Sequence, residues 1–162
     1  MVPYIVLLLG FGLAAAVSQL AAQCEFVGFE DSTASRPIVA YTAKCPRRPG
    51  GPADICSQLN LAHCLSNMDG SLQPPADGSR YSGNRTASFK ESCPSCHVDS
   101  EGWRLYCACE RLDSTFNAAS IALNNIILIQ EGILACSTTI GQEISECPIT
   151  RIGPPERRRF VA

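Results

Sequence analysis

The sequence predicts an all-β domain that is stapled by disulfides and built from two internal repeats. Three observations lead to this prediction. Residues 57–72 and 119–134 align at a constant offset, all ten cysteines lie beyond residue 23, and apolar and polar side chains alternate over residues 103–109. A repeat this short cannot bury its own apolar residues, so we expect the two copies to share one core.

The first 23 residues are typical of a secretory signal peptide. None of them is charged, and an apolar run from Ile5 to Val17 gives way to small residues up to Ser18. The run is shorter than the about 20 apolar residues that a membrane-spanning helix needs, which favours a cleaved signal over an uncleaved anchor. We therefore expect a secreted, extracellular protein that is cleaved after Ser18, with cleavage after Ala22 as the alternative.

The composition limits the class of protein further. An even number of cysteines in a secreted chain favours five disulfides. The mature chain of about 140 residues suits one compact domain. The net charge of −2 gives no reason to expect binding to nucleic acid or to an anionic membrane, and Arg157–Arg159 are interpreted as part of a solvated tail.

The chain is predicted to contain a signal peptide (1–18), one domain (19–136) and a C-terminal tail (137–162). Within the domain, repeat 1 spans about residues 20–72, a linker spans 73–88, and repeat 2 spans about 89–136. The linker is rich in Pro, Gly and Ser and has no hydrophobic period, so it is expected to be exposed. It contains an N-x-T acceptor at Asn84, which a secreted protein can glycosylate.

The alternating residues 103–109 predict a strand, and the turn-forming residues 99–102 precede it. An antiparallel hairpin across this turn would join Cys93 to Cys109 and Cys96 to Cys107. The two pairs differ by one residue in register, so the first strand is expected to have a bulge or an irregular start.

Each repeat core is expected to combine short strands with a helical turn. In the first copy, Leu59 and Leu61 predict a strand, residues 62–67 predict a turn of helix, and Leu72 lies in a strand after an Asp-Gly corner. The second copy is richer in aliphatic residues, and we expect it to be the more deeply buried.

Repeated motifs identify a family that this chain resembles. A hydrophobic residue lies four positions before a cysteine, and an L-x-L segment leads to N-x-D-G-x-L. The residues are Leu20 before Cys24, Phe89 before Cys93, Leu105 before Cys109, and Leu59, Leu61, Asn67, Asp69, Gly70 and Leu72. This pattern, over about residues 20–136, resembles the cyanovirin-N homology family, in the secreted form with extra cysteines found in filamentous fungi.

The resemblance implies a pseudo-two-fold fold. Each half would be a three-stranded sheet plus a hairpin, with strands exchanged between the sequence repeats, and Cys24 would pair with Cys45. It also implies non-catalytic binding of carbohydrate, typically mannose-type oligosaccharides, at a site near each end. The partners would be oligosaccharides or glycoproteins, with no cofactor and no metal.

Carried over to this chain, one family site consists of Asn67, Asp69, Glu91, Ser92, Glu110 and Arg111. Carboxylates, an amide and a guanidinium can each engage vicinal hydroxyls of a sugar. Simpler interpretations exist for each part. The Asn-x-Asp-Gly segment could be only a tight turn, Glu110 and Arg111 could be an exposed ion pair, and Glu91 and Ser92 could be merely solvated.

The second family site is expected to be lost or altered. Its loop positions hold Pro46, Arg47 and Arg48, and its corner holds Ile129, Gln130 and Glu131 in place of an N-x-D triplet. With one working site, the protein would have to form an oligomer to agglutinate its targets, because lectins usually gain avidity through multivalency.

Other functions fit the sequence less well. Zinc binding by Cys93, Cys96, Cys107 and Cys109 is disfavoured by the C-x-C spacing and by secretion. His63 and His97 lie near no obvious nucleophile, and no acid/base pair indicates an enzyme. The alternative hypothesis is an effector-like, disulfide-rich secreted protein that binds a protein partner and has lost sugar binding. No pairing is predicted for Cys56, Cys64, Cys136 and Cys147.

Overall fold

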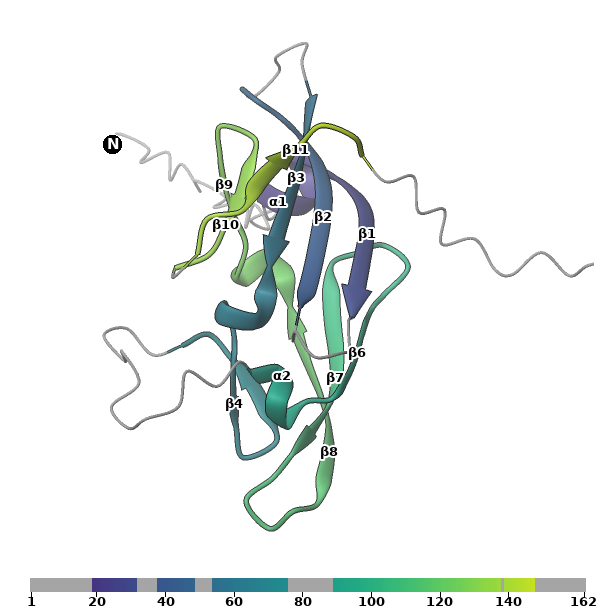
Figure 1. Cartoon of the computed structure of the whole chain (residues 1–162), viewed down its shortest axis with the longest axis vertical. Helices are drawn as coiled ribbons and strands as arrows, with labels where there is room; N and C mark the ends of the chain where they lie inside the picture. The colour runs from purple at the N-terminus through teal and green to yellow at the C-terminus, as the bar shows by residue number, and fades with distance from the viewer. Residues whose placement is uncertain (1–18, 32–37, 49–53, 76–88, 138, 148–162) are drawn as a thin grey trace, which may run out of the picture.

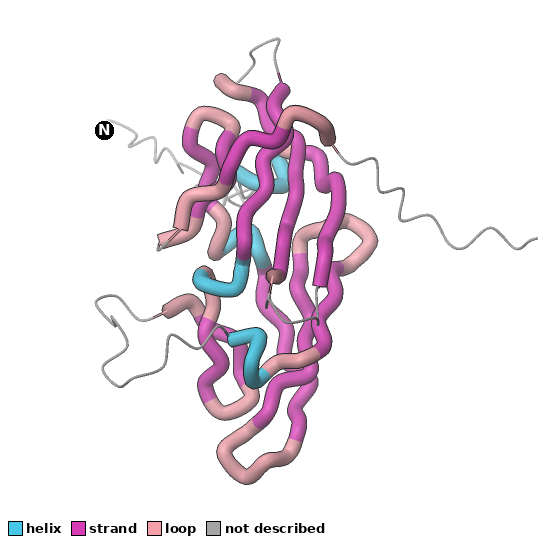
Figure 2. Tube along the Cα trace, in the orientation of Figure 1, coloured by secondary structure: helices cyan, strands magenta, loops and turns pink. Residues whose placement is uncertain are grey.

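The computed structural model describes residues 19–31, 38–48, 54–75, 89–137 and 139–147. The expected signal peptide, Asn84 and the tail beyond Cys147 lie outside the described residues. Within them the protein is mainly β, with a few short helical turns (Figure 2). The all-β prediction is therefore confirmed.

The strands, in chain order, are Glu25–Asp31 (β1), Val39–Pro46 (β2), Asp54–Asn60 (β3), Ser66–Met68 (β4), Ser71–Gln73 (β5), Ser95–Val98 (β6), Arg104–Glu110 (β7), Phe116–Ala122 (β8), Leu128–Gln130 (β9), Ile133–Ala135 (β10) and Gln142–Ile144 (β11). The helical turns are α1 (Gln19–Gln23), α2 (Phe89–Ser92) and the 3₁₀ turns η1 (Leu61–His63) and η2 (Leu123–Asn125). The predicted helical turn at 62–67 is thus displaced, because Leu61 already belongs to η1 and the chain returns to a strand at Ser66.

The strands form two halves, stacked along the long axis of the molecule (Figure 1). One half has the sheet β1-β2-β3-β11 and the hairpin β9–β10, and the other has the sheet β6-β7-β8 and the hairpin β4–β5. Each hairpin packs on the sheet of the other repeat. Leu134 N in β10 donates to Ser57 Oγ in β3 at 2.9 Å, and Asn117 Nδ2 in β8 donates to the Gly70 carbonyl at 2.9 Å. The strand exchange implied by the family resemblance is therefore present.

The β6–β7 hairpin has a regular register once it begins. Cys96 pairs with Cys107 and Val98 pairs with Leu105. Cys93 lies before β6, and Pro94 separates it from the first strand residue. Because proline has no N–H to donate, regular pairing cannot extend back through it. The one-residue difference between the two cysteine pairs therefore comes from an irregular start and not from a bulge.

Five disulfides join the described cysteines. The structure pairs Cys24 with Cys45, Cys93 with Cys109 and Cys96 with Cys107, as expected, and it adds Cys56–Cys147 and Cys64–Cys136. Cys147 follows β11, a strand in the predicted tail that pairs with β3. The first sheet therefore has four strands instead of three.

One hydrophobic core runs through both halves and includes Leu20 of α1 and Phe89 of α2. Tyr41 links the halves, since its buried hydroxyl donates to the Gly102 carbonyl at 3.0 Å, and burial raises the pKa of this phenol well above its usual value. The expectation that the second repeat copy is the more deeply buried is wrong. Ile121 and Ile129 are only half-buried, because the core draws equally on leucines of the first copy.

Candidate functional site

The corner of the first repeat is a two-residue turn between β4 and β5. Asp69 and Gly70 have φ of 51° and 80°, and Met68 pairs with Ser71 across the turn. Positive φ at both central residues is the type I′ geometry that closes short hairpins, and Asp-Gly is one of its preferred dipeptides. The tight-turn interpretation is confirmed, and the turn also leaves the Asp69 side chain exposed.

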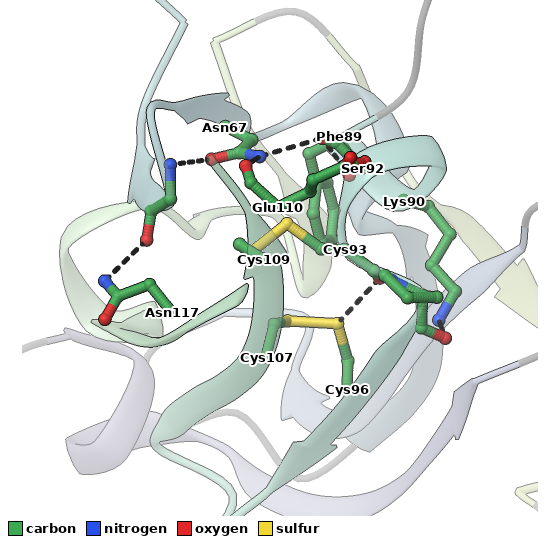
Figure 3. The surroundings of a disulfide bond; sticks show 12 residues. Asn67, Phe89, Lys90, Ser92, Cys93, Cys96, Cys107, Cys109, Glu110 and Asn117 are labelled. Atoms are coloured by element: carbon green, nitrogen blue, oxygen red, sulfur yellow. Dashed lines mark hydrogen bonds between the residues drawn. A yellow bond between two sulfur atoms is a disulfide. The ribbon is translucent and has the colours of Figure 1, made fainter. Parts of the chain in front are cut away.

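Asn67 fixes this corner to two other segments (Figure 3). Its Oδ1 accepts from Gly70 N at 2.8 Å, and its Nδ2 donates to Ser92 Oγ at 3.0 Å and to the Glu110 carbonyl at 2.8 Å. A primary amide has two N–H donors, and both are used here. Asn67 therefore acts as an internal brace between the corner, α2 and the end of β7.

Asp69 meets the loop that follows β7. Its Oδ1 accepts from Leu112 N at 3.0 Å and lies 3.7 Å from Arg111 Nε. The Asp69 and Arg111 side chains are 50% and 46% exposed, respectively. An exposed pair of this kind contributes little to stability, and much of each charged group remains accessible to a ligand.

The loop after β7 is ordered by its own hydrogen bonds. Arg111 N donates to the Thr115 carbonyl at 2.8 Å. The Asp113 carboxylate accepts from Thr115 Oγ1 at 2.6 Å and from Thr115 N at 3.0 Å. The Thr115 hydroxyl, followed by its backbone N–H, holds the pKa of the Asp113 carboxyl below its ordinary value. The loop that carries Arg111 therefore contains a local acidic brace.

A disulfide and a buried ion pair hold the base of this region. Ser92 and Glu110 each adjoin one end of the Cys93–Cys109 bridge, so that bridge sets their separation (Figure 3). Lys90, on α2, pairs with Asp31 of β1 and donates to the Pro94 carbonyl at 2.6 Å. The corner therefore sits on a rigid base.

Asn117 is a contributor that the sequence reasoning missed. Its Nδ2 bonds the Gly70 carbonyl, and a Cβ placed on Gly70 would lie 2.6 Å from Arg111 Cγ and 3.0 Å from Asn117 Cβ. Gly70 is therefore required by both its φ and this close approach. No motif includes Asn117, which meets the corner only because β8 packs against the hairpin of the other repeat.

The opposite end repeats the backbone but not the chemistry. Glu131 and Gly132 have φ of 52° and 82°, close to the values at Asp69 and Gly70. Here Arg47 Nη2 contacts both carboxylate oxygens of Glu143, at 2.9 and 3.1 Å. Glu143 belongs to β11, so the C-terminal strand supplies an internal partner to the arginine of this loop.

A family model describing the CVNH domain matches residues 23–135. The chain belongs to the CVNH family. Comparison with curated protein sequences gives no significant match.

Several solved structures resemble this CVNH chain. A MoCVNH3 variant in complex with (N-GlcNAc)4 has a TM-score of 0.52 and 15% identity, covering 74% of this chain and 97% of its own. Gibberella zeae CVNH has a TM-score of 0.48 and 20% identity, covering 60% and 82%. Microvirin, solved with mannobiose, has a TM-score of 0.48 and 23% identity, covering 72% and 95%. At these identities the likeness concerns the fold.

In this CVNH chain the six predicted site residues lie around one corner but differ in position. Asn67 and Ser92 bond each other, and Asp69 lies beside Arg111. Glu110 contacts Asn67 through its backbone carbonyl, so its carboxylate has no part in this brace. The sixth residue, Glu91, is exposed on α2.

Two further features of the CVNH chain bear on its chemistry. Among the described residues, no group of three or more His, Cys, Asp or Glu side chains could hold a metal ion. No helix in that part of the chain is long and apolar enough to cross a membrane.

Proposed function

We propose that this CVNH protein is a secreted, non-catalytic lectin that binds mannose-type oligosaccharides at the corner of its first repeat. The observation that carries the proposal is the Asp69–Arg111 pair. Both side chains are about half exposed, and they stand on a turn and a loop braced by Asn67. Family membership supports carbohydrate binding, and two similar structures were solved with mannobiose and with (N-GlcNAc)4.

The geometry suits a neutral polyol. A carboxylate accepts two hydrogen bonds from adjacent hydroxyls, and a guanidinium donates to two adjacent oxygens. Asp69 and Arg111 offer both types of contact side by side, with Glu91 exposed on the neighbouring helix. Because these groups are already held in place, binding would lose little side-chain entropy.

The affinity of one such site should be modest. Four to six neutral hydrogen bonds contribute about 0.5–1.5 kcal/mol each, and association itself costs several kcal/mol. The Arg47–Glu143 pair supports loss of the opposite family site, because Arg47 would have to leave Glu143 to engage a sugar. A monomer would then have one family site and bind weakly.

The non-catalytic assignment rests on the same contacts. Glycoside hydrolysis requires one carboxylic acid that donates a proton and a second carboxylate placed across the scissile bond. Asp69 is an acceptor from Leu112 N and lies beside a guanidinium, an environment that favours its ionised form over a proton donor.

One observation favours the alternative, a protein partner. Leu112 is 92% exposed and Met68 is 59% exposed, and both flank the corner. Exposed apolar groups beside a polar centre are also found at protein interfaces. Binding of a protein through this corner without sugar would be the result of a pull-down in which Leu112→Ser, but not Arg111→Lys, abolishes capture.

A glycan array probed with the oxidised mature protein tests the proposal. Asp69→Asn is the matched variant, because asparagine also tolerates this turn and keeps an acceptor for Leu112 N while losing the charge. We expect mannose-terminated hits that Asp69→Asn and Arg111→Lys each weaken about tenfold, with unchanged melting temperatures. An array without hits, or hits that neither variant weakens, would overturn the proposal.

A further inference from the structure

The outer face of the β6-β7-β8 sheet is separate from the corner. Side chains alternate along β7, so that Leu105, Cys107 and Cys109 point into the core, while Tyr106 and Ala108 point outward. The outward side chains of β6 and β8 continue this face, and the residues concerned are exposed. The face is thus a solvated surface with its own composition.

Its side chains are arranged in cross-strand rows. His97, Tyr106 and Ser120 form one row, and the rings of His97 and Tyr106 stack with centroids 5.2 Å apart and planes 10° apart. Neighbouring strands hold these partners opposite one another. The row therefore presents a fixed pair of rings beside a hydroxyl.

The next row is small. Ser95, Ala108 and Ala118 lie opposite one another across the three strands. Beyond this row stands Phe116, which is 59% exposed. Four strand steps separate the row of Tyr106 from the row of Phe116, roughly 13 Å at the rise of a strand. Small side chains between two sets of rings leave a depression.

This trough has a volume of about 590 Å³, within the range of small-molecule sites. None of the described residues that line it is Asp, Glu, Lys or Arg. Nearby Arg104 is directed to Ser120 Oγ at 3.3 Å. A lining without acidic or strongly basic side chains disfavours phosphate-bearing ligands, which need Lys or Arg contacts.

The position of the trough also disfavours an extended peptide. Peptides that add to a sheet pair with the exposed backbone of an edge strand, whereas the trough centres on β7, whose backbone already pairs with β6 and β8. A ligand here must be recognised by side-chain faces and hydroxyls. Aromatic rings supply an apolar face, and Tyr106 Oη and the serines supply donors and acceptors.

We propose that this trough is a second saccharide site, which binds a neutral oligosaccharide across Tyr106 and Phe116. The apolar faces of sugar rings would stack on the aromatic side chains, and the sugar hydroxyls would bond Ser95, Ser120 and Tyr106 Oη. The gap between the two aromatic rows is long enough for more than one sugar ring. Together with the corner, the trough would make a monomer bivalent, which raises avidity without an oligomer.

The test is an amide-resolved NMR titration of the oxidised mature protein, separately with mannobiose, a linear N-acetylglucosamine tetramer and a linear β-1,4-glucose tetramer. At least one saccharide should shift the amides of Ser95–Val98, Tyr106–Ala108 and Phe116–Ser120 in a saturable manner. Tyr106→Ala should weaken this binding about tenfold, and Tyr106→Phe should change it by less than about threefold. Ile140→Ala, which removes an exposed apolar side chain from the other half, is the control and should have no effect.

Three results would overturn the site. One is no saturable shift at these amides with any of the three saccharides, and another is binding that Tyr106→Ala leaves intact. The third is a set of shifts that appears on concentrating the protein alone, which would assign the face to contact between two copies. Asp69→Asn removes the corner only, so loss of one site is distinguishable from loss of the other.

Discussion

The side-chain amide of Asn67 donates to the backbone carbonyl of Glu110 at 2.8 Å and so fixes the first-repeat corner to the end of β7. These residues are 43 positions apart in the sequence. The contact holds the turn bearing Asp69 beside the loop bearing Arg111. It also gives Asn67 a structural role that precedes any contact with a sugar.

We expect Asn67→Asp to destabilise the protein by about 1–3 kcal/mol, because the Glu110 carbonyl loses its donor and faces a carboxylate. The variant still accepts from Gly70 N, so the turn itself should persist. Urea unfolding measures the loss, and Ser92→Ala, which removes one partner of the same amide, should cost less. An Asn67→Asp protein of unchanged stability would contradict the brace.

The Asp113–Thr115 contact gives a prediction for pH. The pKa of Asp113 is lowered in the folded state, so its contribution to loop stability is present above the unfolded value of about 3.9 and is lost as pH falls through the folded value. Thr115→Val removes the hydroxyl donor and should raise the pKa of Asp113 towards its ordinary value. Carbon-detected NMR titration of the Asp113 carboxyl measures the change, and an unaltered pKa in the variant would refute the assignment.

The Cys56–Cys147 bridge should support stability without supporting the corner. It closes 91 residues of sequence and anchors β11 in the other half of the molecule. We expect the double variant Cys56→Ala/Cys147→Ala to lose about 2–4 kcal/mol of unfolding free energy. Calorimetric titration with mannobiose should still give wild-type affinity at the corner. A parallel fall in this affinity would show that the two halves are coupled.

The mature protein should begin at Gln19. Leu20 is 1% exposed in the core, and Cys24 N donates to its carbonyl at 2.9 Å. Cleavage after Ala22 would remove this side chain and leave its core position empty, at a cost of about 2–5 kcal/mol by analogy with large-to-small substitutions. The intact mass of the secreted protein decides between the two cleavage sites, and a chain beginning at Gln23 would contradict the prediction.

Local patterns in the sequence predicted much of the fold. Alternation marked β7, the Asp-Gly dipeptide marked the turn, and the spacing of Cys96 and Cys107 matches a regular antiparallel register. Such features depend on neighbours along one or two strands, so a single sequence contains the information that determines them.

Long-range contacts were harder to predict. The pairings of Cys56 with Cys147 and Cys64 with Cys136 depend on how separate elements pack, and cysteine spacing alone permits many connectivities. Asn117 reaches the corner only through the exchange of hairpins between repeats. Glu110 was named for its carboxylate, yet its carbonyl makes the contact, because strand geometry sets the direction of the backbone independently of residue type.

The most direct test of the corner is an amide-resolved NMR titration with mannobiose, comparing the wild type with Asp69→Asn. Saturable shifts at residues 67–70 and 110–112 that Asp69→Asn strongly weakens are the predicted result. Saturable shifts confined to residues 46–48 and 129–131, or no saturable shift at millimolar sugar, would contradict a carbohydrate site at the first-repeat corner.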